Sequence, residues 1–333
     1  MDVPFSYSVT IRTLGTAGEK YEKLLRSIAR QTIQPEKIVV VLPEGYAPPA
    51  PVLGSEEFIF SAKGMVPQRL AALGCVNSDY ILFCDDDVEL IPQFMERLAD
   101  ALLHHGYSAA AGPLLSFFPP KGPVPFVGSI VGEASVMARG RKNTYVRILG
   151  TGGFSYNRSV DLQHHVIYNT ESFAGTCFCA STAAMKAVHM YDEMWLEKHG
   201  FAAWEDRVMI SKLIVNGYRA CVVSDASYEH NDGKTSVKKL RLEPIFARGF
   251  NHYLYWHRFL YKTAKSGGRR AWLRFCICYY KVMFRFYYTL RVLVGRSRRE
   301  EKKAWTQGYN AAKAYIKTEV YKAIPDPVIL RKD

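Results

Sequence analysis

The 333-residue sequence contains no Cys-x-x-Cys pair, and none of its nine histidines stands at zinc-finger spacing. The seven cysteines are an odd number, so they cannot all pair with one another. Both facts favour reduced, mostly buried thiols over a structural zinc site. Residues 1–9 have no basic segment followed by an apolar run. We therefore expect no secretory signal and a cytoplasmic protein.

Acidic residues are scarce in the last third of the chain. Residues 240–333 contain 21 Lys and Arg against 6 Asp and Glu, a balance of +15, whereas residues 1–239 contain 23 against 25, a balance of −2. The net charge of +13 therefore belongs entirely to the C-terminal region. This asymmetry predicts two functions in one chain, a nearly neutral domain over 1–239 and a basic region over 240–333.

No internal repeat or low-complexity segment is present, and 48% hydrophobic residues suffice for a packed core. Strand and helix patterns alternate, which is typical of a doubly wound, mostly parallel α/β sheet of the Rossmann-like kind. Glycine and proline are frequent in residues 117–153, where we expect loops and a small hairpin. The regular elements are predicted at 6–14, 17–31, 37–42, 58–62, 67–76, 80–84, 92–105, 172–180, 182–189, 204–217 and 218–223.

Three adjacent carboxylates, Asp85, Asp86 and Asp87, directly follow the apolar strand pattern of residues 80–84. Ligands of doubly wound sheets gather at the carboxyl ends of strands. Adjacent carboxylates repel one another there unless a cation compensates. Mg²⁺ or Mn²⁺ bound to one or two carboxylates and to the phosphates of a nucleotide would do so. The alternative is a solvated acidic turn before the helix that begins near Pro92.

In the order of these features, residues 6–230 resemble the inverting glycosyltransferase family 2, whose members have the GT-A fold and use nucleotide sugars. The acid triplet resembles the family's D-x-D motif. Residues 64–69 resemble the segment whose arginine lies near the diphosphate. Gly175-Thr176 resembles the small-residue strand on the acceptor side, and Glu205-Asp206 resembles the pair whose aspartate is the catalytic base.

The resemblance implies a complete site and a division of the first domain. Residues 1–116 would bind the nucleotide sugar, and residues 117–239 would form the acceptor side. The implied roles are catalysis by Asp206, donor binding by Thr13, Glu44, Arg69, Asp85 and Asp86, metal binding by Asp85, Asp87 and His230, and an acceptor side of Gly175, Thr176, Trp204 and Glu205.

The chain also departs from the family pattern. The family's first strand usually ends in Pro-Thr and its second in paired aspartates, whereas this chain has Arg12-Thr13-Leu14 and Leu42-Pro43-Glu44. Glu44 either replaces the base-contacting aspartate or is a plain turn residue. Trp204 either stacks on a sugar or packs in the core. Asp206 has the alternative of being an ordinary first-turn helix acid.

The expected activity is inverting transfer of a sugar from a nucleotide diphosphate to an acceptor hydroxyl, in cell-surface polysaccharide or glycolipid assembly. Asp206 would take the proton of that hydroxyl, while the metal ion and Arg69 stabilise the departing diphosphate. Two alternatives stay open. One is a metal-dependent nucleotidyltransferase, and the other is a non-enzymatic, membrane-peripheral binding protein.

Aromatic and cationic residues interleave over 251–299, with Trp256 and Phe259 among the aromatics. Within one helix, Arg270, Lys281 and Arg285 fall within about 40° of Arg274. We predict a basic, aromatic helical extension that lies in the plane of an anionic membrane, at its cytoplasmic face, close to a glycan or lipid-linked acceptor.

The cations interrupt the apolar run, so a transmembrane span is not expected. Nucleic-acid binding is not expected either, because it would leave the acid triplet unexplained. The alternative is that the aromatic residues pack on the catalytic domain or on a second subunit of a homo-oligomer.

Overall fold

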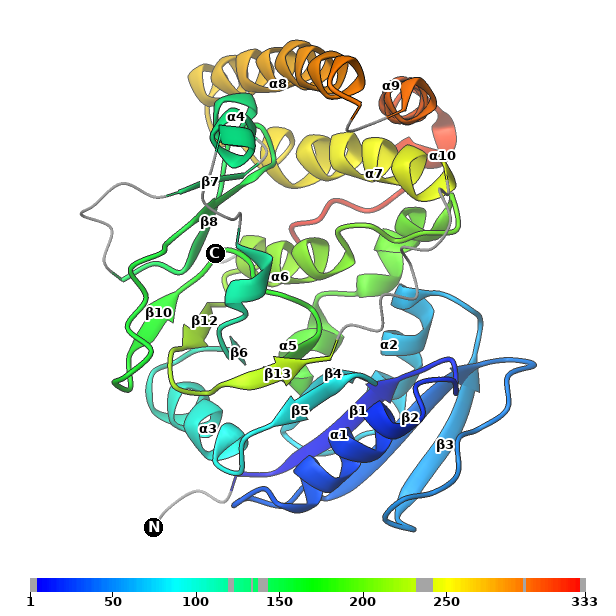
Figure 1. The fold of residues 1–333 in the computed structure, drawn as a ribbon, viewed down its shortest axis with the longest axis vertical. Helices are drawn as coiled ribbons and strands as arrows, with labels where there is room; N and C mark the ends of the chain where they lie inside the picture. The colour runs from blue at the N-terminus through cyan, green and yellow to red at the C-terminus, as the bar shows by residue number, and fades with distance from the viewer. Residues whose placement is uncertain are drawn as a thin grey trace.

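A computed structural model describes residues 5–118, 123–132, 134–136, 143–231, 242–295 and 298–329. An eight-stranded sheet in the order β10-β12-β6-β11-β4-β1-β2-β3 forms its centre (Figure 1). Strands β1 to β4 run parallel, and β11 runs antiparallel to both of its neighbours. The strands are β1 (Tyr7–Arg12), β2 (Lys37–Pro43), β3 (Glu56–Ser61), β4 (Tyr80–Asp85), β6 (Ala109–Ala111), β10 (Ile167–Asn169), β11 (Cys177–Ser181) and β12 (Ala220–Val223).

Both faces of this sheet are buried. Within β2, Val39 and Val41 belong to one hydrophobic cluster, while Val40 and Leu42 belong to the cluster on the opposite face. A continuous apolar strand therefore serves both layers, as is typical of parallel sheets. Helices α1 (Glu19–Ala29) and α3 (Phe94–His104) cover one face, and α2 (Met65–Gly74), α5 (Thr182–Ala187) and α6 (Glu205–Val215) cover the other. The predicted mostly parallel α/β sheet is thus confirmed.

Residues 117–153 contain more regular structure than the predicted loops and hairpin. The hairpin exists as β8 (Val146–Ile148) and β9 (Phe154–Tyr156), but β7 (Ala134–Val136) adds a third, parallel strand. A 3₁₀ turn (Leu115–Phe117) and helix α4 (Pro123–Val131) precede it. The pattern did not predict this helix because it contains prolines at 123 and 125. Proline disfavours a helix interior but is tolerated in a first turn.

The C-terminal region consists of several helices at one end of the molecule (Figure 1). They are α7 (Leu242–Tyr255), a π-helical turn (Trp256–Tyr261), α8 (Gly267–Leu293), α9 (Arg299–Tyr315) and α10 (Glu319–Lys322). A 3₁₀ segment (Met190–Glu197) lies between α5 and α6. In the part of the chain that the structure describes, no helix is long and apolar enough to cross a membrane.

The prediction that the aromatic residues of 251–299 all face a membrane is wrong for residues 251–261. Trp256 and Phe259 are only 3% and 2% exposed and belong to the cluster that also covers the sheet. A helix with apolar residues on every side is stable only inside a core. The alternative, packing on the catalytic domain, is confirmed for this segment. Only α8 has a large exposed aromatic face among the described helices of this region.

Helices α7 and α9 cross at two glycines. A Cβ added to Gly249 would lie 2.5 Å from the carbonyl oxygen of Trp305, and one added to Gly308 would lie even closer to that of Phe246. Real Cβ atoms do not approach backbone oxygen so closely, so only glycine permits this crossing. The two helices are therefore in direct backbone contact.

A buried charge cluster joins the C-terminal region to the sheet layer. Glu193 accepts two hydrogen bonds from Arg258, at 2.7 and 2.9 Å, and lies 3.0 Å from the Nζ of Lys212. All three side chains are 0% exposed. Because burial alone would disfavour the charged carboxylate, it is the two cations that hold the pKa of Glu193 below its usual value. The region 240–333 thus shares its core with the preceding domain.

Candidate active site

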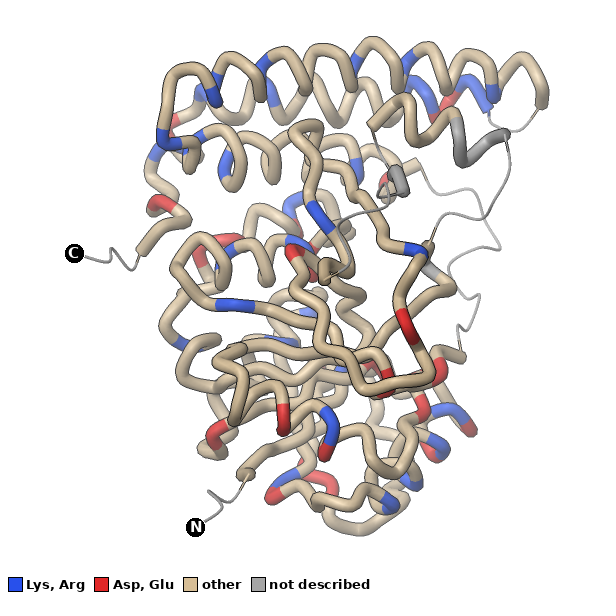
Figure 2. Tube along the Cα trace, turned by 90° about the vertical axis from the view of Figure 1, so that its left-hand side faces the viewer, with Lys and Arg blue, Asp and Glu red and all other residues tan. Residues whose placement is uncertain are grey.

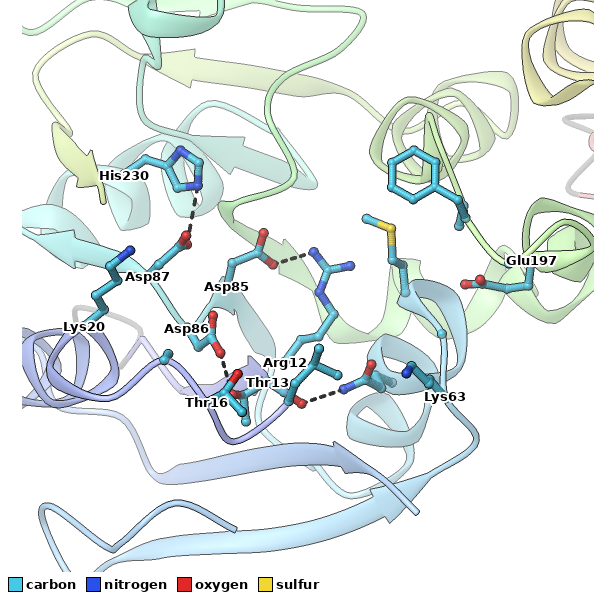
Figure 3. A pocket seen from close by; sticks show the side chains of 18 residues that line it. Arg12, Thr13, Thr16, Lys20, Lys63, Asp85, Asp86, Asp87, Glu197 and His230 are labelled. Atoms are coloured by element: carbon cyan, nitrogen blue, oxygen red, sulfur yellow. Dashed lines mark hydrogen bonds and ion pairs between the residues drawn. The ribbon is translucent and has the colours of Figure 1, made fainter. Parts of the chain in front are cut away.

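A cavity of about 770 Å³ opens at the carboxyl ends of β1 and β4 (Figure 3). It lies where a doubly wound sheet is expected to bind ligands. Its walls come from the turn after β1, the start of α2, the acid triplet, residues 197–202 and β13 (Tyr228–His230). The charged and hydroxyl side chains that line it are Arg12, Thr13, Thr16, Lys20, Lys63, Asp85, Asp86, Asp87, Glu197 and His230.

Asp85 is paired with arginine. The guanidinium of Arg12 donates to its carboxylate over 2.6 Å, and that of Arg69 lies 3.6 Å away. The sheet register causes the first contact, because Arg12 and Asp85 are opposite each other on the paired strands β1 and β4. The first acid of the triplet is therefore neutralised by the protein itself.

The carboxylate of Asp86 is held by Thr13, a residue predicted to bind the nucleotide sugar. The Thr13 hydroxyl donates to the Asp86 carboxylate over 2.5 Å and accepts from the backbone N–H of Gly15 over 2.9 Å. Burial raises the pKa of Asp86, and the charges of Asp85 and Asp87 add to that rise, against the hydrogen bond from Thr13. The structure thus brings Thr13 and Asp86 together at the cavity.

Asp87 lies beside His230. Their side chains are 3.4 Å apart, Nε2 to Oδ1. The antiparallel pairing of β5 (Val88–Leu90) with β13 brings them together, since Val88 is opposite His230. Burial would raise the pKa of Asp87, but the hydrogen bond and the charge of His230 hold it below its usual value. Two groups far apart in sequence therefore present an oxygen and a nitrogen ligand to the same cavity.

The donor set fits a hard divalent cation that is shared with a substrate. Over the residues described, no three His, Cys, Asp or Glu side chains are grouped as a complete metal cage. Mg²⁺ is commonly held by one or two carboxylates plus substrate phosphates and water. Asp87 faces the cavity and supplies one carboxylate of that pattern, with the His230 imidazole beside it as a nitrogen donor, whereas Asp85 is tied to Arg12. The metal roles of all three residues stay predictions.

The Glu205-Asp206 pair begins helix α6. Trp204, just before it, has the left-handed dihedrals φ 74° and ψ 19°, which are strained for a residue other than glycine. Oδ2 of Asp206 accepts from the backbone N–H of Gly175 over 3.2 Å, and Oδ1 accepts from that of Arg207 over 2.8 Å. The carboxylate of Asp206 is thus held in a fixed orientation while its side chain stays partly exposed.

Glu205 has a different environment. It is 3% exposed and forms a close ion pair with Arg69, with Arg12 3.9 Å away. Burial raises the pKa of Glu205, and the two arginines oppose that rise. Arg69 in turn donates to the carbonyl of Gly175 over 2.5 Å. The acid therefore belongs to a buried network of charges that lies behind the cavity and supports Asp85.

Gly175 and Thr176 connect the acid triplet with Asp206. The backbone N–H of Asp85 donates to the carbonyl of Thr176 over 2.8 Å. A Cβ on Gly175 would lie 2.7 Å from the Cβ of Asp206, so a larger residue would displace the predicted base. The residues predicted to bind the nucleotide sugar and those predicted on the acceptor side are thus neighbours within one network. Gly175 and Asp206 do not line the 770 Å³ cavity itself.

Three predicted residues, Glu44, Trp204 and Arg69, do not line the cavity. Glu44 is exposed at the end of β2 and is not part of the cavity wall. Trp204 lies against the buried guanidinium of Arg207, 3.9 Å from its ring centroid, which favours the packing interpretation. Arg69 is 4% exposed and lies behind the wall. Their proposed contacts with substrate stay predictions.

Several residues that line the cavity were not predicted from the sequence, notably Arg12, Lys20, Lys63 and Glu197. Arg12 had a usable signal, because it directly follows the apolar residues of the first strand, at its carboxyl end. Glu197 had none. It accepts from the backbone N–H of Val66 over 2.8 Å, a contact between residues 131 positions apart.

Residues 59–165 match the profile of glycosyl transferase family 2. The match covers 107 of the 333 residues. A solved structure of S. aureus TarS residues 1–349 in complex with UDP-GlcNAc shares its fold, with a TM-score of 0.52 and 14% identity, over 96% of this chain and 82% of that one. This likeness supports the fold predicted from the sequence, a mostly parallel α/β sheet of the GT-A type.

A structure of GalNAc-T7 with UDP, GalNAc and Mn²⁺ also aligns, with a TM-score of 0.49 and 10% identity over 84% of this chain. The present chain spans only 55% of that one. A comparison with curated protein sequences gave no match to this chain.

Proposed function

We propose that this protein is a metal-dependent, inverting glycosyltransferase that moves a sugar from a nucleotide diphosphate to the hydroxyl of a glycan or lipid-linked acceptor. One observation carries the proposal. A cavity with Asp86, Asp87 and His230 on its wall is joined, through Gly175-Thr176, to a second acid that is oriented by two backbone N–H groups. The family profile and the UDP-GlcNAc in the TarS structure support a nucleotide-sugar donor.

The donor diphosphate would enter a cavity that carries both signs of charge. Asp87 and His230 would hold Mn²⁺ or Mg²⁺, and the ion would neutralise the diphosphate as it departs. Arg12, Lys20 and Lys63 supply cations on the same wall. The Thr13 hydroxyl and the Asp86 carboxylate, which hold each other in place by a hydrogen bond, would contact the nucleoside part of the donor.

Asp206 would act as general base. Its carboxylate takes the proton of the acceptor hydroxyl as that oxygen attacks the anomeric carbon. The new bond joins the acceptor oxygen to the anomeric carbon, the bond from that carbon to the phosphate oxygen breaks, and the diphosphate leaves with the electron pair. One displacement inverts the configuration. Glu205 is unsuited to this role, because it is buried and already paired with Arg69.

Product analysis with a panel of nucleotide sugars, with and without Mn²⁺, tests the proposal. A glycosyltransferase releases nucleoside diphosphate in a metal-dependent way, and the true donor raises the melting temperature by mass action. Release of inorganic pyrophosphate from a nucleoside triphosphate and a sugar phosphate would instead indicate a nucleotidyltransferase. If neither nucleoside diphosphate nor pyrophosphate is released and no nucleotide sugar raises the melting temperature, the result would favour the non-enzymatic binding protein.

A further inference from the structure

Helix α8 exposes an apolar face along its whole length. Phe275, Val282, Phe286 and Leu293 are between 55% and 76% exposed. At 100° per residue, the exposed apolar side chains fall within an arc of about 80° that contains no charged residue. This surface, called the α8 stripe below, consists of Trp272, Phe275, Tyr279, Val282, Phe286, Leu290 and Leu293.

The α8 stripe is separate from the face that packs on the protein. Leu273, Cys276, Ile277, Tyr280 and Phe284 are buried and lie on the opposite side of the helix. A helix with one packing partner normally has a polar outer face. Here both faces are apolar, and an exposed apolar surface of this size marks a site of interaction.

Helix α4 widens the exposed surface. The hydroxyl of Tyr279 donates to the carbonyl of Ile130 over 2.5 Å, and the Ile130 side chain is 42% exposed. Figure 1 shows α4 directly beside α8 at the same end of the molecule. Its sequence, PVPFVGSIV, contains no charged residue. Two apolar helices thus contribute to one surface.

Cations border the α8 stripe and acids are missing. Residues 251–299 contain twelve Lys and Arg and no Asp or Glu. Arg270, Arg274, Lys281 and Arg285 fall within an arc of about 60° between the buried face and the stripe. Figure 2 shows Lys and Arg positions spaced along the helix at the upper end of the molecule. The surface is therefore apolar in the middle and positive along one edge.

We propose that the α8 stripe docks on the surface of an anionic lipid bilayer, with α8 lying parallel to it. The aromatic side chains would enter the boundary between headgroups and acyl chains, and the bordering cations would contact lipid phosphates. At 1.5 Å per residue the 27-residue helix offers roughly 40 Å of contact. A second copy of this chain fits less well, since its own acid-free, basic border would be brought against the first.

The chain contains a built-in reporter of docking. Of the five tryptophans, Trp272 is 53% exposed, Trp204 is partly buried, and Trp195, Trp256 and Trp305 are at most 5% exposed. We expect the fluorescence of the full chain to shift to the blue with vesicles of phosphatidylglycerol and phosphatidylcholine, and to be quenched by brominated acyl chains. Trp272→Phe should abolish the shift while the protein still sediments with the vesicles.

Substitution of the stripe tests the surface directly. Phe275→Glu with Phe286→Glu should weaken sedimentation with anionic vesicles by roughly ten-fold or more, because both charges would enter the apolar boundary. Both side chains are more than half exposed, so the melting temperature should stay within the error of the wild type. Phe60→Glu is the matched control, because Phe60 is 50% exposed on the distant strand β3 and should leave binding unchanged.

Three results would overturn the inference. Equal binding to purely zwitterionic vesicles would remove the role of the cations. Unchanged sedimentation of the double variant would remove the role of the stripe. A dimer in light scattering that the double variant converts to a monomer, without vesicle binding by the wild type, would assign the stripe to a second copy. Vesicle binding needs no transferase activity, so its outcome is independent of the proposed function.

Discussion

Arg12 and Asp85 are the last residues of two neighbouring parallel strands, and their side chains meet at 2.6 Å on the floor of the cavity. The contact divides the acid triplet. Asp85 is paired with arginine, while Asp86 and Asp87 face the same cavity beside Thr13 and His230. The same guanidinium approaches Glu205, so one arginine stabilises two acids of the site.

Arg12→Met should therefore weaken both fold and site. It removes a charge-assisted hydrogen bond and leaves Asp85 with only the more distant Arg69, at a cost of about 1–3 kcal/mol in the free energy of unfolding. Urea denaturation measures the loss, and calorimetry with a nucleoside diphosphate measures the weaker affinity. Arg12→Lys should recover part of both. Wild-type values in the methionine variant would show that the pair has no role.

Asp206→Asn should stop transfer without disturbing the donor. Loss of a general base typically lowers the rate about 10²–10⁴-fold. The amide keeps an acceptor oxygen for one of the two backbone N–H groups, and the residue does not line the cavity, so the donor dissociation constant should stay near that of the wild type. Steady-state kinetics and calorimetry separate the two effects. Asp100→Asn, at an exposed helical acid, is the control.

Glu193→Gln should loosen the C-terminal region. The change leaves Arg258 and Lys212 buried without their shared carboxylate, which typically costs about 3–5 kcal/mol. Glu319→Gln, whose ion pair with Lys322 is exposed, should cost less than about 0.5 kcal/mol. Chemical denaturation compares the two variants. Equal stability of both would mean that the buried cluster contributes no more than a surface pair.

The carboxylate of Glu193 also predicts that the free energy of unfolding depends on pH in the acid range. The folded-state pKa of Glu193 lies below the ordinary value of 4.5, so its stabilisation is complete above pH 4.5 and is lost as the pH falls through the folded value. The difference in denaturation midpoint between wild type and Glu193→Gln should therefore shrink as the pH falls below 4.5. A difference that stays constant as the pH falls until the protein unfolds would contradict the assignment.

His252 predicts a loss of stability in a higher pH range. Burial, together with the nearby charge of Arg207, lowers its pKa from 6.5 to about 3. Between these values the unfolded chain binds a proton that the folded chain refuses, so stability falls by about 1.4 kcal/mol per pH unit as the pH drops. His257, with a pKa lowered to about 4, acts in the same direction.

His252→Phe tests this slope. The variant should be less stable at pH 7, because it loses the hydrogen bond to the carbonyl of Thr151, yet its stability should change less between pH 6.5 and 4.5. Denaturant midpoints at half-unit intervals measure the difference. A slope equal to that of the wild type would show that another group takes up the proton.

The alternating half of the fold was predictable because its strands and helices are amphipathic or apolar in a regular way. Strands β1 to β4 and helices α1 to α3 lie within a few residues of their predicted bounds. By contrast, Ala109–Ala111 forms the central strand β6 without any β-branched or aromatic residue. Its neighbours β11 and β12 impose the strand, and a single sequence does not contain that information.

The site shows the same limit. The cavity position of Thr13, Asp86 and Asp87 was predictable, because each follows a strand of the main sheet at the edge where ligands bind, and His230 ends the short strand β13 beside them. The partner of Asp85 was not, because sequence shows the end of each strand but not which strands pair in which register. The burial of Trp256 was hidden for a related reason: an apolar helix and a membrane-facing helix have similar composition, and only tertiary packing distinguishes them.

The glycine crossing of α7 and α9 has a geometric consequence for an enzyme at a surface. Because the backbones of α7 and α9 touch and Arg258 is bound to the buried Glu193 of the preceding domain, we expect the C-terminal helices to move with the sheet layer as one body. An enzyme resting on α8 would then hold its nucleotide cavity at one height and one tilt above the lipid. The length of the acceptor, rather than any bending of the protein, would decide which hydroxyl groups come within range.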